Sequence, residues 1–236
     1  MPIREMGYEY KKSHHYIAQV HQRQFADASG QVYILNRNGK IYKTVPLNIF
    51  KESHYHTVKG SLKAENAFAR LESEFGEVLT NQINRQQPLT ASGRLIISYY
   101  VAAMLFRPKL QKKNMLDGFR QALAMGRDIQ RRIQENPDIV QGFGPTSSGS
   151  SFTMEDIEKL LSDPNSHHTM LALRMMTDFG PFISNMNWVL FLAPGNETFI
   201  CSDNPVGMMS PIREKQFGRE AFRSSVGLAD DDVQML

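Results

Sequence analysis

Residues 95–106 read LIISYYVAAMLF, and this run is apolar on every side apart from Ser98. Twelve helical residues span roughly 18 Å, which is well short of the ~30 Å hydrocarbon core of a membrane. A helix that is apolar all round and too short for a membrane is buried by its neighbours. We therefore expect residues 95–106 to form the central helix of a helical core, which ends at Pro108.

Amphipathic helices are predicted on both sides of this run. From Ser61 to Pro88 the apolar residues recur about every 3.6 positions, with charged residues mostly off the stripe. A long basic helix is expected at 109–134, where the apolar stripe is broken and much of the helix should be solvated. A Thr-x-x-Asp capping box then starts a helix at 153–161, and a methionine-rich helix follows at about 168–186.

Alternating residues predict a β-hairpin near the N-terminus. QVYIL and KIYKTV flank Asn38-Gly39, and Asn-Gly tolerates the two positive φ angles of a type I′ turn. That two-residue turn would place four apolar side chains together on one face: Val32, Ile34, Ile41 and Val45.

A second hairpin is predicted near the C-terminus, where Pro194-Gly195-Asn196-Glu197 separates WVLFLA from TFICS. The fold class is thus α+β, a mostly helical core with a β-hairpin near each end. We expect one domain over 1–236, with a flexible Gly/Ser-rich break at 142–151.

The net charge of +3 is an average over unlike segments. Residues 1–63 carry +6 and residues 94–132 carry +7, whereas residues 151–236 carry −6. The single cysteine excludes an intramolecular disulfide framework and fits a reducing compartment. With no apolar stretch long enough for a signal or a membrane span, the sequence predicts a cytoplasmic protein without a membrane partner.

The stretch HHYIAQVHQRQF (14–25) could be a short helix with a polar face. In a helix His15, Gln19 and Arg23 are spaced i, i+4, so an imidazole, an amide and a guanidinium would form a row. Such a row could supply a base or metal ligand and a phosphate clamp. A solvated polar face is the alternative.

Two further polar groups follow apolar segments. Asp203 and Asn204 come directly after a predicted strand, where side chains can leave the sheet, although turn formation explains Ser-Asp-Asn-Pro about as well. Arg107 ends the central apolar helix and needs a partner, for which Glu72 and Asp203 are candidates, so a structural ion pair is the alternative. Cys201 is interpreted as a small core residue rather than a nucleophile.

Several motifs are absent from the sequence. It contains no G-x-x-x-x-G-K-[ST], G-x-G-x-x-G, H-E-x-x-H or G-x-S-x-G. Phosphate-loop nucleotide hydrolysis, dinucleotide-dependent redox chemistry and serine hydrolase chemistry are therefore disfavoured.

Taken in order, these motifs resemble the domain-of-unknown-function 4238 family. The likeness begins with HHYIAQVHQRQFA and VYILNRNGKIYKTVPLNIFKESHYHT. It continues through ARLESEFGEVL, MLFRPKL and FICSDNPV, and it spans roughly residues 14–210. The family is functionally uncharacterised, so the resemblance implies no catalytic role. It does imply that seven residues belong to one constellation: His15, Gln19, Arg23, Glu72, Arg107, Asp203 and Asn204.

The chain also departs from the family pattern. Ala18 stands where proline is usual, and His21 and Gln22 stand where an aromatic and an aliphatic residue are usual. Family members tend to continue into a further strand after Ser-Asp-Asn-Pro, which suggests a shortened member.

The sequence is compatible with two functions. The constellation could belong to a hydrolase of phosphodiester or nucleic-acid substrates, with which a divalent metal ion is compatible. Alternatively, the region 94–132 could serve a non-catalytic module that binds nucleic acid, another polyanion or an acidic protein. A third reading is that the acidic segment 151–236 packs on the basic helix and cancels its charge. The basic side chains concerned are Lys109, Lys112, Lys113, Arg120, Arg127, Arg131 and Arg132.

Overall fold

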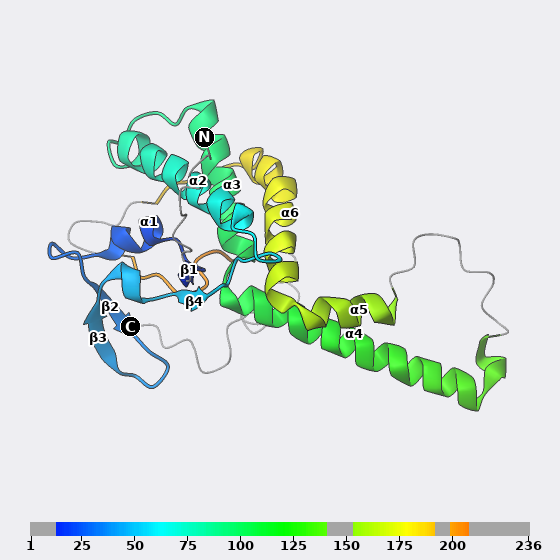
Figure 1. Ribbon diagram of the computed structural model, residues 1–236. Helices are drawn as coiled ribbons and strands as arrows, with labels where there is room; N and C mark the ends of the chain where they lie inside the picture. Colours follow the sequence, from blue (N-terminus) through cyan, green and yellow to red (C-terminus); the bar gives the residue numbers. More distant parts are fainter. Residues whose placement is uncertain (1–12, 141–152, 192–198, 208–236) are drawn as a thin grey trace, which may run out of the picture.

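The computed structural model describes residues 13–140, 153–191 and 199–207. In this part of the chain, a helical body carries a small β region on one side (Figure 1). Helix α4 (Lys109–Glu135) extends away from the body, and the shorter helix α5 (Met154–Ser162) lies alongside it.

The remaining elements have the following bounds. The other helices are α1 (Gln19–Gln22), α2 (Lys63–Val78), α3 (Ala91–Phe106) and α6 (Pro164–Ser184). The strands are β1 (Ser13–His15), β2 (Val32–Leu35), β3 (Ile41–Thr44) and β4 (Lys51–Ser53). Short 3₁₀ turns cover Arg23–Phe25, Pro46–Asn48 and Pro137–Val140, and a π turn, Leu79–Ile83, extends α2.

Helix α3 is the centre of the core, as the run at 95–106 predicts. It packs against both α2 and α6. The hydroxyl of Thr90 caps it by accepting a hydrogen bond from the Gly93 amide at 3.0 Å. The rings of Tyr100 on α3 and Phe75 on α2 stack with their centroids 3.7 Å apart, so the two helices share one apolar interface.

The β region consists of two separate antiparallel pairs, β1–β4 and β2–β3. The α+β class with a mostly helical core and a hairpin near the N-terminus is therefore confirmed. The turn of the second predicted hairpin lies in 192–198, outside the described residues. Its described flanks, 187–191 and 199–201, contain no strand, so that hairpin stays a prediction. The flexible break predicted at 142–151 also lies outside the described residues.

The register of the β2–β3 hairpin differs from the prediction by one residue. Leu35 pairs with Ile41 and Ile34 with Tyr42, because the connection has three residues rather than two. Gly39 takes a positive φ of 74° while Asn38 does not, so the turn is not type I′. A one-residue slip moves a side chain to the opposite face. Ile41 accordingly lies on the outer face, 65% exposed, and does not join Val32.

The helix predicted over 14–25 is also shorter than expected. Residues Ser13–His15 form strand β1, which pairs with β4 so that His15 lies opposite Lys51. Ala18 is extended, with φ −58° and ψ 134°, and the helix begins only after it. The partner strand lies more than thirty residues away in the sequence, so local periodicity does not reveal it.

The later helices follow the sequence closely. Helix α4 begins directly after Pro108 and buries only Leu123, which confirms that most of it is solvated. Helix α5 begins with the predicted capping box: Asp156 accepts from the Thr153 amide at 3.0 Å, and the Thr153 hydroxyl accepts from the Asp156 amide at 3.2 Å. None of the described helices is long and apolar enough to cross a membrane.

Candidate functional site

Arg107 joins three segments at the C-terminal end of α3. Its side chain is 2% exposed, and each guanidinium nitrogen donates to a different partner. Nη1 bonds the Glu72 carboxylate at 2.5 Å, Nε bonds His56 Nε2 at 2.9 Å, and Nη2 bonds the backbone carbonyl of His15. The guanidinium also lies 4.7 Å from the centre of the Phe68 ring. Of the two partners considered for Arg107, the structure supplies Glu72.

His56 completes this buried polar core as a neutral imidazole. Nε2 lies 3.3 Å from the His15 carbonyl as well as 2.9 Å from Arg107 Nε. Because Arg107 can only donate, Nε2 is the acceptor and the proton of the neutral ring is on Nδ1. The His56 amide donates to His14 Nδ1 at 2.9 Å, and the two rings stack 6.0 Å apart. Burial, and then the positive charge of Arg107, lower the pKa of His56 well below its ordinary value.

Two more buried side chains fix the carboxyl end of α3. The Tyr55 hydroxyl donates to the Arg107 carbonyl at 3.2 Å, and His168 on α6 donates from Nε2 to the Phe106 carbonyl at 3.0 Å. Burial lowers the pKa of His168 to about 4. The carbonyls at this helix end, which lack intrahelical donors, are thus satisfied by the segment before α2 and by α6.

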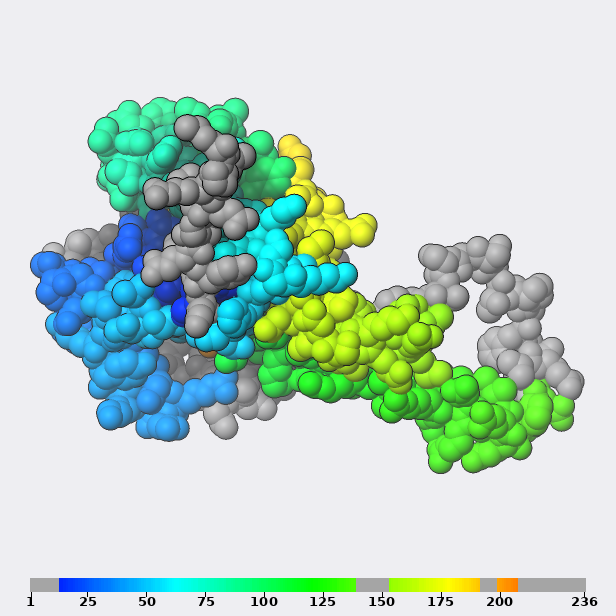
Figure 2. Space-filling model, viewed as in Figure 1, coloured from blue at the N-terminus to red at the C-terminus, as the bar shows by residue number. Residues whose placement is uncertain are grey.

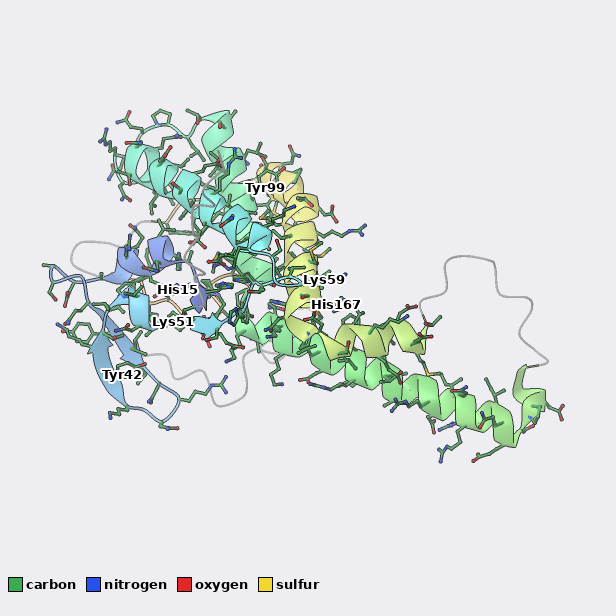
Figure 3. All side chains as sticks on the ribbon, in the orientation of Figure 1. His15, Tyr42, Lys51, Lys59, Tyr99 and His167 are labelled. Atoms are coloured by element: carbon green, nitrogen blue, oxygen red, sulfur yellow. The ribbon has the colours of Figure 1, made fainter. Side chains whose placement is uncertain are left out.

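His15, Gln19 and Arg23 form the predicted row, although His15 is in a strand rather than a helix. Gln19 Nε2 lies 3.4 Å from His15 Nδ1, and Arg23 Nη2 donates to Gln19 Oε1 at 3.2 Å. His15 Nε2 lies 3.3 Å from the Leu47 carbonyl. A carbonyl only accepts hydrogen bonds, so Nε2 carries the proton and Nδ1 keeps its lone pair. Figure 3 shows His15 on β1 beside Lys51 on β4.

The environment of His15 favours the neutral ring. Burial is the largest influence and lowers its pKa, with Lys51 and Arg107 acting in the same direction. The Leu47 carbonyl and Glu72 oppose this shift. The imidazole is therefore unprotonated near pH 7, which is the form that can accept a proton.

The far end of the row opens on a surface depression. Gln19 and Arg23 line it together with Asp27 and the apolar edge Val45–Leu47, and its volume is about 480 Å³. Arg23 is exposed, and within the described part of the chain Gln19 is the only side chain that its guanidinium bonds. Guanidinium N–H groups at the depression are thus available to an anion.

Asp203 and Asn204 lie in a local turn. The Ser202 hydroxyl accepts from the Asn204 amide at 3.0 Å and donates to the Asn204 carbonyl at 2.9 Å. Asp203 is exposed. Burial raises the pKa of the Tyr16 hydroxyl, Lys109 lowers it, and the charge of Asp203 acts in the same direction as burial. No hydrogen bond or ion pair joins Asp203 to the row or to Arg107 among the described residues.

Comparison with known proteins identifies a family. A family model described as a protein of unknown function (DUF4238) matches residues 13–229, which run from β1 past the Ser-Asp-Asn-Pro turn. This match covers most of the 236 residues. The chain belongs to the DUF4238 family. No curated protein and no solved structure matches it, so the comparison establishes the family alone.

The basic side chains on α4 of this DUF4238 protein all have partners. Glu52, Asp117, Asp128 and Glu158 are the carboxylates concerned. Only Glu158, which bonds Arg127 at 2.6 Å, belongs to the acidic segment 151–236. The seven paired residues are Lys109, Lys112, Lys113, Arg120, Arg127, Arg131 and Arg132.

Sequence patterns did not identify every residue of the site. His56, Tyr55 and His168 contact the end of α3. The aromatic His-Tyr-His at 54–56 is a signal for the first two, and no pattern marks His168. Cys201 is exposed rather than in the core, contrary to expectation, and its Sγ lies 3.0 Å from His21 Nε2. Within 13–140, 153–191 and 199–207, no three His, Cys, Asp or Glu side chains group as metal ligands.

Proposed function

We propose that this DUF4238 protein is a hydrolase of phosphodiester or nucleic-acid substrates, with its site at the His15–Gln19–Arg23 row. The observation that supports the proposal is the continuous row itself. It begins at a neutral imidazole and ends at an exposed guanidinium on a depression of about 480 Å³. A base and an anion-binding group are the minimum that phosphodiester hydrolysis requires, and here Gln19 links the two.

In the proposed reaction His15 is the general base. The Leu47 carbonyl holds Nε2–H, which leaves the Nδ1 lone pair to take a proton from an attacking water molecule. As the new P–O bond forms, the ester P–O bond breaks, and the departing oxygen takes a proton from solvent, which balances the proton held by His15. The 3.4 Å contact from Gln19 is long enough for an incoming group to replace it. Arg23 then binds the phosphate and stabilises the negative charge that develops on its oxygens.

The other members of the constellation receive supporting roles in the proposal. Glu72 and Arg107 are positioning residues, because Arg107 bonds the His15 carbonyl and fixes β1. Asp203 is assigned only an electrostatic influence, through its effect on the pKa of Tyr16, and Asn204 is assigned no role in the reaction.

The test compares single variants on RNA and DNA oligonucleotides, with Mg²⁺ and with EDTA. His15→Ala should lower turnover about 100-fold or more, the usual contribution of a general base, while oligonucleotide binding stays intact. His167→Ala is the matched control, because His167 bonds the Asp163 carbonyl and lies apart from His15 in Figure 3. Equal turnover in the two variants, or none in the unmodified protein, would contradict the proposal.

The second candidate is nucleic-acid binding by α4 without turnover. Helix α4 carries seven Lys and Arg against three Asp and Glu, a net +4. Exposed ion pairs contribute only about 0–1 kcal/mol, so a polyanion can compete for these side chains. Replacing Arg131 and Arg132 by Ala should then weaken binding and lower its salt dependence, with no effect of His15→Ala.

A further inference from the structure

Helix α4 has one covered face and one open face. Leu123 is buried on the covered face, where Arg127 bonds Glu158 of α5. A side-chain carbon added to Gly126 would come within 2.9 Å of Met154 Sδ. Figure 2 shows α5 against the half of α4 nearer the body, and the far half of α4 extends beyond it.

The open face carries an apolar stripe that α5 does not reach. It consists of Gly118, Ala122, Met125 and Ile129, and we call these four residues the open stripe. All four are exposed, Met125 at 65% and Ile129 at 54%. A side-chain carbon added to Gly118 would meet nothing within 4 Å. The residues are spaced by four, three and four positions, the interval at which one helix contacts another.

We propose that the open stripe binds an amphipathic helix of net negative charge on another protein. The composition of the stripe suits a helix, because Gly118 and Ala122 let a partner backbone approach. Met125, between them and Ile129, can adapt its side chain to the partner. Helix-in-groove recognition uses apolar anchors at this spacing.

The net charge of α4 indicates which kind of partner the open stripe binds. Helix α4 carries a net +4, which its partners Glu52 and Glu158 reduce to +2. An acidic helix therefore gains attraction, whereas a second α4 would place two positively charged surfaces together. Nucleic acid would also be attracted, but a phosphate backbone would leave Met125 and Ile129 without apolar partners. Binding of a second α4 or of nucleic acid to the open stripe would therefore contradict the proposal.

The experiment measures binding of a designed peptide to the full chain by fluorescence anisotropy. The peptide has about three heptads, with Leu at a and d and Glu at e and g, and a scrambled peptide of the same composition is the control. Ala122→Glu places a charge on the open stripe, while Ala124→Glu adds the same charge at an exposed position on the other side of α4. The heptad peptide should bind the unmodified protein and Ala124→Glu equally, and Ala122→Glu at least about tenfold more weakly.

A neutral variant separates shape from charge. Ile129→Gln should weaken the heptad peptide several-fold without changing the helix content seen by circular dichroism. Equal weakening by Ala122→Glu and Ala124→Glu, or no preference over the scrambled peptide, would overturn the proposal. The proposal would also be overturned if the unmodified protein formed a dimer that Ala122→Glu dissociates. Binding of RNA that only Ala122→Glu abolishes would overturn it as well. Activity at His15 is not involved, so this test is independent of the proposed hydrolysis.

Discussion

Arg107 is the side chain whose loss should cost the most stability. Removing it would leave Glu72 without its 2.5 Å partner and His56 Nε2 and the His15 carbonyl without donors. Breaking a buried pair by removing one partner costs about 3–5 kcal/mol. We expect Arg107→Ala to lower the free energy of unfolding by about that amount in urea titrations.

The exposed Arg70–Glu74 pair provides the control, with a similar bond of 2.9 Å but one helical turn apart on the surface of α2. Arg70→Ala should change the free energy of unfolding by less than about 0.5 kcal/mol. Equal stability of Arg107→Ala and Arg70→Ala would contradict the central structural role that the contacts of Arg107 indicate.

His168 makes stability depend on pH. The pKa of His168 is about 4 in the folded protein, whereas its ordinary value, which applies to the unfolded chain, is 6.5. As the pH falls, the unfolded chain therefore takes up the proton first. The free energy of unfolding should therefore decrease below about pH 6.5, by roughly 2 kcal/mol between pH 7 and pH 5 for this residue. His168→Gln keeps a side-chain N–H donor for the Phe106 carbonyl but removes the group that titrates.

Urea titrations at pH 7 and pH 5 measure this difference. The loss of stability on acidification should be about 2 kcal/mol smaller in His168→Gln than in the unmodified protein. His167→Gln is the neighbouring control and should keep the full loss. An unchanged loss in His168→Gln would show that other groups control the acid sensitivity.

At the scale of elements, two glycines test how helices approach each other. A side-chain carbon at Gly180 of α6 would lie 2.3 Å from the Tyr99 ring on α3, whereas one at Gly118 of α4 would meet nothing within 4 Å. Gly180→Ala should destabilise the protein by about 1–3 kcal/mol through overpacking. Gly118→Ala should stabilise it by up to about 1 kcal/mol, because alanine favours the helix.

Thermal unfolding of the two alanine variants supplies the measurement, and the midpoints should move in opposite directions. A rise in the midpoint for Gly180→Ala would mean that α3 and α6 are not in close contact at Tyr99.

Helices and strands were predicted correctly where a local sequence pattern alone determines them. Periodicity and caps predicted α3, α4 and α5, because burial and capping act within a few residues of each helix. The β2–β3 register was missed because Asn38-Gly39 fits two loops of different length, and one residue reverses the face of Ile41. The row of His15, Gln19 and Arg23 was predicted from spacing. The contact of Arg107 with the His15 carbonyl was implied only by the family resemblance, since it depends on pairing between distant segments, and the contact of His56 with Arg107 was not predicted.

At the scale of the whole molecule, a well-packed helical body carries helix α4, which makes few apolar contacts and which we call the arm. Helix α3 buries seven residues, while the longer α4 buries only Leu123. Local opening of a helix requires less free energy where few apolar contacts are lost. The two helices should therefore differ in protection from hydrogen exchange even though both are regular.

We expect amides in 95–106 to exchange only through global unfolding, and those in 125–135 to exchange at least about a thousandfold faster. Mass spectrometry of peptides covering the two ranges measures this at one pH and temperature. Adding the heptad peptide should slow exchange in 118–129 alone, because those residues include the open stripe. Equal protection of both ranges in the protein alone would mean that the arm is already covered in solution, which would contradict an open face on α4.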